Sequence, residues 1–321
     1  MGVGFVILLY ATWSSVFSLA KIALQYSPPV FLTGVRMLIA SVLILGFLAI
    51  AKRASLKLTA KQIFSLGLLG FFSVYLSNIL EFWGLQHLTA AKACFIYSLS
   101  PFFAAFFSYL HFKEKMNARK WLGMSIGIAG MLPVLWLQSG SEELLHAFSF
   151  FTWPTLALIG AAASAVYGWV LLRVAVKDSN ISPLAANGMS MLFGSLLALL
   201  HSHFVESWHP TPIAPGNWAP FLQITLAITC ISSILCYNLY GMMLKRYTAT
   251  FLSFMGLLSN IFAPLHGWLV LGEPIAWEIF ASTAVLSLGL WIVYSEELKQ
   301  GYIVKKAART SPTQPATDEK I

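Results

Sequence analysis

The sequence predicts an all-α membrane protein whose ten transmembrane helices form two inverted five-helix repeats. Three observations predict this fold: the composition, the number of long apolar runs, and the side of the membrane on which the basic residues fall. Of the 321 residues, 58% are hydrophobic and only 10% are charged. Because a soluble domain carries about 25% charged residues, this chain cannot cover a water-facing surface, but it can cover a lipid-facing one.

The apolar runs give the number of spans. A helix needs about 20 apolar residues to cross the hydrocarbon core, and none of the runs alternates polar and apolar residues as a barrel strand would. The predicted spans are 2–24, 30–50, 63–86, 88–111, 118–137, 150–172, 182–204, 218–240, 249–271 and 275–295. An even number of spans places both chain ends on one side of the membrane.

The basic residues set the orientation. All but three of the 20 lysines and arginines fall in the loops and the C-terminal tail on the side of the N-terminus. The loops on the opposite side carry glutamates instead, including Glu206 and Glu273. Because cytoplasmic loops are enriched in Lys and Arg, the sequence predicts a multi-pass protein of the cell inner membrane with both termini cytoplasmic. The net charge of +8 therefore reflects the basic residues of the cytoplasmic loops and tail. No nucleic-acid partner is expected.

An internal repeat divides the chain into two halves. The pairs Thr89/Thr248, Glu114/Glu273, Gly130/Gly289 and Val134/Val293 are each separated by 159 residues. The predicted units are a first repeat at 1–137, an outer linker at 138–149, a second repeat at 150–295 and a largely disordered cytoplasmic tail at 296–321. Five spans per repeat force the second repeat to be inverted, which is the architecture of many secondary carriers.

Two segments resemble the drug/metabolite transporter superfamily, specifically its EamA-type ten-helix members. They are FWGLQHLTAAKACFIYSLSPFFAAFFSYLHFKEKMNARKWLGMSIGIAGM at 82–131 and RYTATFLSFMGLLSNIFAPLHGWLVLGEPIAWEIFASTAVLSLGLWIV at 246–293. The resemblance implies a proline-bearing fourth helix, a Gly-Glu turn and a Gly-containing fifth helix in each half. It extends to about residue 295. The first half departs from this pattern, because Lys113-Glu114 stands where the family has Gly-Glu.

Within the superfamily, the whole sequence is similar to the S-adenosylmethionine/S-adenosylhomocysteine carriers of obligate intracellular bacteria. This similarity implies a secondary, non-ATP transporter that works by alternating access and exchanges the two metabolites. Export of amino acids or drugs is the alternative function. The sequence indicates neither import nor export, and neither the coupling ion nor the oligomeric state.

Four ionisable side chains inside the predicted spans are the primary candidates for a substrate site. They are Lys21, Arg36, Glu81 and Lys92. Charges within the membrane are costly and by default functional. Arg36 suits bidentate capture of a carboxylate or phosphate, and Glu81 could meet a substrate amine or sulfonium. The structural alternatives are an Arg36–Glu81 ion pair and interfacial anchoring of the two lysines.

Uncharged residues complete the candidate site. Trp13, Tyr97 and Tyr167 could stack on an aromatic group or hold a cation over a ring face, and Asn78 could hydrogen-bond either a substrate or another helix. Pro101 and Pro264 each remove a helical hydrogen bond. These prolines serve either as gating hinges or only to shape the cavity.

Other motifs have structural interpretations or exclude other functions. Gly123 and Gly127 are expected to permit close helix packing, and Glu114 and Glu273 to cap the helices that follow them. The sequence has no HExxH motif, P-loop or metal-ligand cluster. It therefore predicts no enzyme, cofactor or metal site, with an intramembrane enzyme as a distant alternative. The expected partners are a small metabolite, the lipid bilayer, and a coupling ion or exchanged metabolite.

Overall fold

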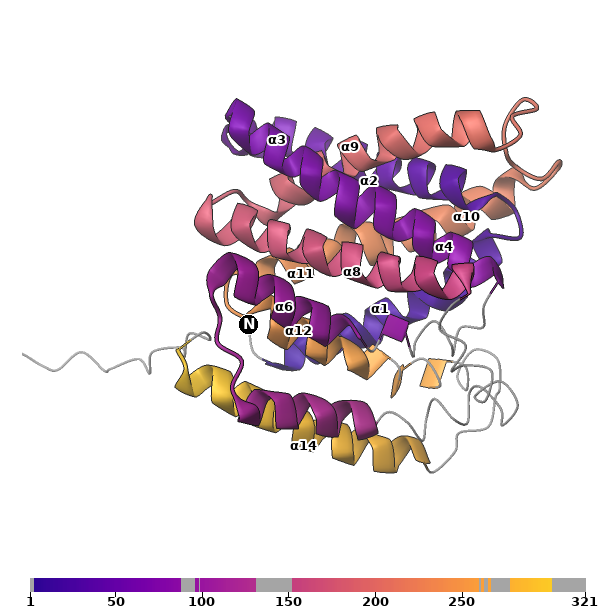
Figure 1. Cartoon of the computed structure of the whole chain (residues 1–321). Helices are drawn as coiled ribbons and strands as arrows, with labels where there is room; N and C mark the ends of the chain where they lie inside the picture. Colours follow the sequence, from indigo (N-terminus) through magenta and orange to yellow (C-terminus); the bar gives the residue numbers. More distant parts are fainter. Residues whose placement is uncertain are drawn as a thin grey trace, which may run out of the picture.

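The computed structural model describes residues 3–87, 96–97, 99–130, 152–259, 261–262, 265–266 and 278–301. In these ranges the regular secondary structure is entirely helical, and the helices form a bundle of long rods with similar axis directions (Figure 1). Lys92, Pro264 and Glu273 lie outside the described residues, as does the predicted linker at 138–149.

The first half of the chain contains helices that correspond to the predicted spans. They are α1 (Val3–Ala23), α2 (Pro29–Ala51), the short η1 (Arg53–Leu56), α3 (Ala60–Leu69), η2 (Gly70–Leu76), α4 (Ser77–His87) and α6 (Ser100–Phe112). A further helix covers residues 118–130. The first three predicted spans therefore agree with the described helices within a few residues.

The second half repeats this order. Its helices are α8 (Trp153–Arg173), η3 (Val174–Asp178), α9 (Pro183–Val205), α10 (Trp218–Ile228), η4 (Thr229–Cys236), α11 (Tyr237–Met243), α12 (Ala249–Met255), η5 (Gly256–Leu258) and α14 (Glu278–Lys299). Among the residues that the structure describes, five continuous helical stretches are long and apolar enough to cross a membrane: 29–51, 60–87, 153–178, 183–205 and 218–243.

Local sequence signals explain where several helices begin. Pro29 and Pro183 stand in the first turns of α2 and α9, where a missing N–H costs no hydrogen bond. Thr59 and Gln62 form a reciprocal capping box at the start of α3. Thr248 caps α12 by accepting a hydrogen bond from the Phe251 amide. These caps satisfy backbone groups that the membrane could not hydrate.

Among the described residues, two π-helical segments occupy the same place in each half, and a third, η3, continues α8 without a π-helical counterpart in α1. The π-helix η2 joins α3 to α4, and the π-helix η4 joins α10 to α11. Their first residues, Gly70 and Thr229, are 159 positions apart, which is the separation of the sequence repeat. π-Helices are rare and are frequently found at functional sites, so the matched pair η2 and η4 indicates a shared local architecture.

Helix contacts also occur in matched sets. The second helices of the two halves, α2 and α9, pack against each other most extensively. α4 packs on α8, and its counterpart in the second half, α11 with η4, packs on α1. α6 packs on α12. Several contacts made by one half therefore have an equivalent in the other among the described residues.

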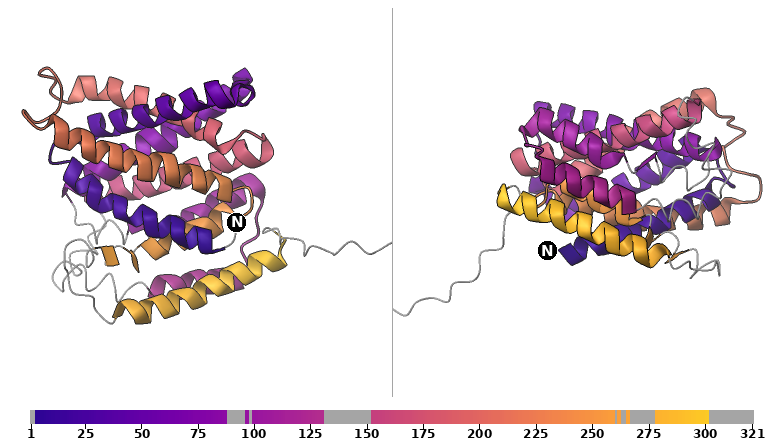
Figure 2. Two further views of the ribbon diagram at one scale, coloured as in Figure 1. Left: turned by 180° about the vertical axis from the view of Figure 1, so that it is seen from behind. Right: turned by 60° about the horizontal axis from the view of Figure 1, so that its bottom comes forward.

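A close glycine crossing joins the helix at 118–130 to α14. A Cβ added to Gly289 would lie 2.6 Å from the Gly123 carbonyl oxygen, and one added to Gly123 would lie 3.0 Å from the Gly289 carbonyl oxygen. The two helices lie side by side along one face of the bundle (Figure 2). The structural interpretation of Gly123 and Gly127 as packing residues is therefore confirmed.

The N-terminal end of α1 and the C-terminal end of α14 lie at the same end of the bundle (Figures 1 and 2). The turn between α2 and α3, which carries Lys52 and Arg53, lies at this end as well. Large apolar side chains such as Ile50 and Phe204 are exposed on the bundle surface, where a soluble protein would carry polar groups. The protein is therefore a multi-pass membrane protein.

The turn after α6 differs from the expectation for Glu114. Asn117, rather than Glu114, caps the next helix by accepting a hydrogen bond from the Lys120 amide. Glu114 is buried, and its Oε1 accepts a hydrogen bond from Arg173 at the end of α8. The capping interpretation was wrong because a cationic partner from the other half reaches this carboxylate. Lys113 has a φ of 54°, the left-handed conformation that glycine adopts without steric cost.

Pro101 lies at the start of a helix and not in the middle of one. It lies in the first turn of α6, and the short helical segment at residues 96–97 precedes it after a turn. Leu99 forms the N-cap of α6, so Pro101 stands where a missing N–H costs no hydrogen bond within α6.

Candidate functional site

A cavity lies between helices of both halves. Its walls come from α1, α2, η2, α4, α6, α8, η4, α11, α12 and η5. Its empty space, with the open mouth included, amounts to about 1060 Å³. The residues that line it include Tyr10, Trp13, Arg36, Ser73, Asn78, Glu81, Phe82, Tyr97, Ser100, Trp169, Ser232, Tyr237, Ser253 and Ser259.

Arg36 reaches the cavity from α2. Its side chain is buried, with 3% of the residue exposed, and its Nη2 donates a hydrogen bond to Oδ1 of Asn78. The guanidinium carbon lies 5.1 Å from the centre of the Phe82 ring. Its Nε has no hydrogen-bond partner in the described structure. A buried guanidinium with an unused donor beside a cavity is suited to bind an anionic group.

Asn78 is held rigidly at the junction between η2 and α4. Its Nδ2 donates to the carbonyl oxygens of Ser73, at 3.2 Å, and Val74, at 2.8 Å. Both carbonyls belong to the π-helical segment. With its amide nitrogen engaged there, Asn78 presents its oxygen to Arg36, as the hydrogen-bond pattern requires.

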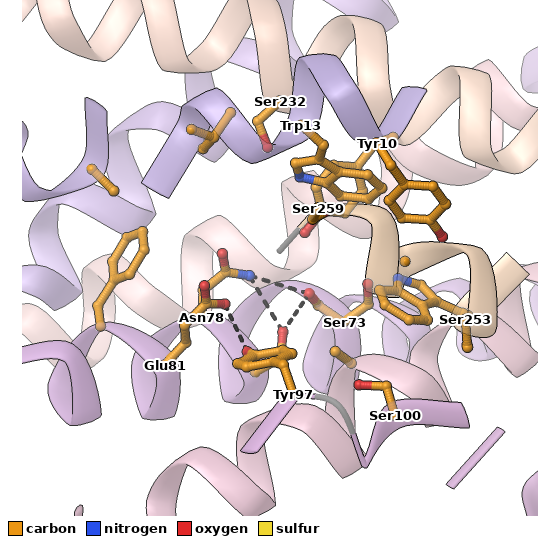
Figure 3. Close-up of a pocket in the computed structure, with 18 of the residues that line it drawn as sticks. Tyr10, Trp13, Ser73, Asn78, Glu81, Tyr97, Ser100, Ser232, Ser253 and Ser259 are labelled. Atoms are coloured by element: carbon orange, nitrogen blue, oxygen red, sulfur yellow. Dashed lines mark hydrogen bonds between the residues drawn. The ribbon is translucent and has the colours of Figure 1, made fainter. Parts of the chain in front are cut away.

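Glu81 follows Asn78 by three positions, so the two side chains lie on one face of α4. Its Oε2 accepts a hydrogen bond from the Tyr97 hydroxyl at 2.9 Å. Figure 3 shows Asn78, Glu81 and Tyr97 grouped on one side of the cavity. No ion pair joins Arg36 to Glu81; the ion pairs among the described residues lie elsewhere. The structural alternative of a direct Arg36–Glu81 pair is therefore wrong.

Aromatic rings form a second wall. Trp13 on α1 lies 5.4 Å from Tyr237, 6.0 Å from Tyr240 and 6.5 Å from Trp169, centre to centre. Tyr10 stacks against Trp13 at 6.2 Å, and Figure 3 places these two rings together, away from Asn78 and Glu81. Such a cluster can take a planar heteroaromatic ring between its faces or attract a cation.

Some residues of the two walls come from equivalent positions of the two halves. Asn78 is the second residue after η2, and Tyr237 is the first residue after η4. The residues 159 positions after Asn78 and Glu81 are Tyr237 and Tyr240. The first half therefore supplies polar groups where the second half supplies phenol rings.

The remaining predicted site residues have different settings. Tyr167 lies outside the cavity lining, in an aromatic cluster with Phe72, Phe107 and His111. Lys92 and Pro264 lie outside the described residues, as does the side chain of Lys21. Of the predicted substrate-binding set, the structure brings Trp13, Arg36, Asn78, Glu81 and Tyr97 to one cavity.

The sequence reasoning left several lining residues out of the candidate site. Trp169 and Tyr237 were indistinguishable from packing aromatics, and small hydroxyl residues carry no signal of their own in an apolar run. The lining serines are Ser73, Ser77, Ser100, Ser232, Ser253 and Ser259. Ser73 and Ser232 lie in the two π-helices, again 159 positions apart. The separation of 159 residues between Ser73 and Ser232 is the sequence signal that could have identified these two serines as candidates.

Comparison with known proteins identifies the family. The chain matches the EamA-like transporter family at residues 1–136 and again at 152–295. It is 39% identical over 293 residues to the S-adenosylmethionine/S-adenosylhomocysteine transporter of Chlamydia trachomatis serovar L2, covering 91% of this chain and 88% of the relative. The protein of the same name from Chlamydia muridarum is 38% identical, with 91% of each chain covered.

More distant relatives and a solved structure extend the likeness. A Bacillus subtilis transporter of uncharacterised activity is 25% identical over 91% of this chain and 83% of its own length. A crystal structure superimposes with a TM-score of 0.68 at 16% identity, covering 91% of this chain and 95% of the other, and shows the shared fold. This protein therefore belongs to the EamA-like transporter family and is a membrane transporter, not an enzyme.

Proposed function

We propose that this protein is a secondary carrier that exchanges S-adenosylmethionine for S-adenosylhomocysteine across the cell inner membrane by alternating access. The observation that carries the proposal is the cavity between the halves, which combines a guanidinium whose Nε has no hydrogen-bond partner among the described residues, a carboxylate and an aromatic wall. The 39% identity to a relative named for this transport supports the same substrate pair.

The chemistry of S-adenosylmethionine matches the two walls. Its amino-acid end carries a carboxylate, for which Arg36 supplies the unused donor. Its ammonium and sulfonium groups are positive, and Glu81 is the carboxylate that lines the cavity among the described residues. Its adenine is a planar ring that fits the faces of Trp13 and Trp169. S-Adenosylhomocysteine differs by the loss of one methyl group and the sulfonium charge, so it fits the same site.

The architecture proposed for this carrier is two inverted repeats of five helices, at 1–137 and 150–295. The matched π-helices, the equivalent helix contacts and the two family matches support it. In such carriers the substrate site lies near the midplane between the repeats, which rock against each other. The basic turns at one end of the bundle support placing both termini in the cytoplasm.

Transport into proteoliposomes tests the function. Vesicles with the purified protein and loaded with S-adenosylhomocysteine are expected to take up labelled S-adenosylmethionine, whereas empty vesicles take up little. An uncoupler should leave this uptake unchanged, because exchange needs no ion gradient. Uptake that instead follows a proton or sodium gradient, or that prefers amino acids or lipophilic drugs from a competitor panel, would show that the proposed exchange is wrong.

Arg36→Ala tests the site within the same assay. The variant is expected to lose roughly tenfold to a hundredfold in transport efficiency, because a hydrogen bond to a charged group contributes about 1.5–3 kcal/mol. Arg53→Ala is the matched control, since Arg53 lies in the exposed turn after α2. Normal transport by an Arg36→Ala protein that assembles like wild type would remove Arg36 from the site.

A further inference from the structure

Arg36 is buried beside a neutral amide although a carboxylate lies close by on the same helix as that amide. Asn78 occupies the position next to the guanidinium, and Glu81 lies one turn further along α4, bonded to Tyr97. A buried arginine ordinarily pairs with a carboxylate, because its charge is then compensated where water is absent. Here the carboxylate of Glu81 lies one helical turn beyond Asn78, which is the residue that contacts Arg36.

The Asn78 side chain can act only as a neutral acceptor in this position. Its Nδ2 donates hydrogen bonds to two carbonyl oxygens, and both belong to η2. The side-chain oxygen must therefore face Arg36. This contact orients the guanidinium through Nη2 and leaves Nε without a partner among the described residues. The arginine is therefore fixed in place with its full charge still uncompensated by a direct ion pair.

Tyr97 has a corresponding effect on Glu81. Its hydroxyl donates to Oε2 at 2.9 Å, so the carboxylate is oriented by a neutral donor rather than by the arginine. Two opposite charges thus remain separate within one cavity. A cavity of this kind binds best a ligand that carries both charges, because such a ligand compensates both at once.

From this geometry we propose that Asn78 is the positioning residue for the ligand carboxylate: it orients Arg36 while leaving the charge of Arg36 available. An aspartate of the same shape would instead form a direct ion pair with Arg36 and compete with the carboxylate of the ligand. Asn78 thereby sets the preference for the amino-acid end of the substrate. This inference rests on the proposed function, since it assumes that the ligand presents an amino-acid carboxylate to Arg36.

The decisive experiment compares three probes on Asn78→Asp. Binding to the purified protein is measured for S-adenosylmethionine, S-adenosylhomocysteine and 5′-methylthioadenosine, which lacks the amino-acid end. The variant is expected to lose roughly tenfold to a hundredfold in affinity for the first two probes, the effect of one lost charge-assisted contact. Its affinity for 5′-methylthioadenosine, measured by direct binding, should remain within about twofold of wild type.

Controls separate this role from a general structural one. Asn217→Asp makes the same chemical change in an exposed loop before α10 and should leave all three affinities unchanged. Asn78→Ser keeps a neutral acceptor and is expected to retain selectivity for the amino-acid end. Should Asn78→Asp fail to assemble, Asn78→Ala serves instead: it should weaken the two amino-acid probes several-fold more than 5′-methylthioadenosine.

The outcomes are distinguishable. Unchanged binding of S-adenosylmethionine by Asn78→Asp, or an equal loss for all three probes, would overturn the role of Asn78 while leaving the carrier function intact. Failure of the wild-type protein to bind either S-adenosylmethionine or S-adenosylhomocysteine would overturn the proposed function itself. A selective loss confined to the two amino-acid probes supports the proposal.

Discussion

At the residue scale, the cavity contains two charges whose hydrogen-bond partners among the described residues are neutral. Arg36 contacts Asn78, and Glu81 contacts Tyr97. Each charge is thereby oriented without being neutralised. This arrangement carries a cost in stability, since buried charges are expensive, and such a cost is commonly retained where a ligand supplies the missing compensation.

Glu81→Gln is expected to change the preference between the two metabolites. The substitution keeps the shape and an acceptor for Tyr97 but removes the negative charge that attracts the sulfonium. Affinity for S-adenosylmethionine should fall about tenfold, as expected for one lost electrostatic contact of about 1–2 kcal/mol, while affinity for S-adenosylhomocysteine falls less. Competition for labelled substrate measures both. An equal decrease for the two ligands would show that Glu81 does not sense the sulfonium.

Lys113→Gly is expected to stabilise the protein slightly. Lys113 has a φ of 54° at the end of α6, a conformation that costs an L-residue about 1–2 kcal/mol, whereas glycine adopts it freely. Part of this gain is offset by the flexibility of glycine in the unfolded chain. A thermal-unfolding midpoint in detergent at or above that of wild type is the expected result, and a clear decrease would contradict it.

At the element scale, the bundle relies on close crossings and on interrupted helices. The π-helices η2 and η4 place side chains of α4 and α11 toward the cavity, and glycines allow neighbouring backbones to touch. Helix association in lipid depends on such packing, because the apolar side chains are solvated equally well by lipid tails. Single small residues therefore have large effects where backbones meet.

Gly289→Ala tests the crossing between α14 and the helix at 118–130. The added methyl group would lie 2.6 Å from the carbonyl oxygen of Gly123, a backbone atom that cannot rotate away. Overpacking of this kind costs about 1–3 kcal/mol, so the thermal midpoint should fall. Gly46→Ala on α2 is the matched control: nothing lies within 4 Å of its added Cβ, and its stability should be unchanged or slightly higher. Equal effects of the two changes would contradict the crossing.

At the scale of the whole molecule, ion pairs join the two halves at one end of the bundle. Lys120 and Glu297 are both fully buried and 3.3 Å apart, and Glu297 also accepts a hydrogen bond from Thr248 at 2.6 Å. Arg173 pairs with Glu114 in the same way across the halves. These contacts connect elements of the two halves through buried charges.

Glu297→Gln is expected to destabilise the protein strongly. It removes the charge of the carboxylate that lies 3.3 Å from the buried Lys120 ammonium, and removal of one partner of a buried ion pair costs about 3–5 kcal/mol. The double replacement Lys120→Met with Glu297→Met should recover most of the loss, because neither charge is then buried. Arg119→Ala is the control, since that side chain is 67% exposed and 3.8 Å from Glu296, and should cost no more than about 1 kcal/mol. Unfolding midpoints in detergent give the comparison, and a harmless Glu297→Gln would contradict it.

The sequence by itself determined the properties that depend on composition and order along the chain. Long apolar runs can only be helices in a bilayer, because every backbone group must be satisfied within the segment. The basic turns and the offset of 159 residues between the halves follow directly from the residue order. The cost of burying charge also identified Arg36 and Glu81 as candidates before any contact was known.

Only the tertiary structure decided which side chains meet. The Arg36–Asn78 and Glu81–Tyr97 contacts, in place of a direct ion pair, depend on π-helical turns that leave no clear mark in an apolar run. Glu114 reads as a local cap but pairs with Arg173, which is 59 positions away. A sequence pattern specifies which groups are costly to bury. The partners that compensate those groups come from packing between distant helices, which local periodicity does not encode.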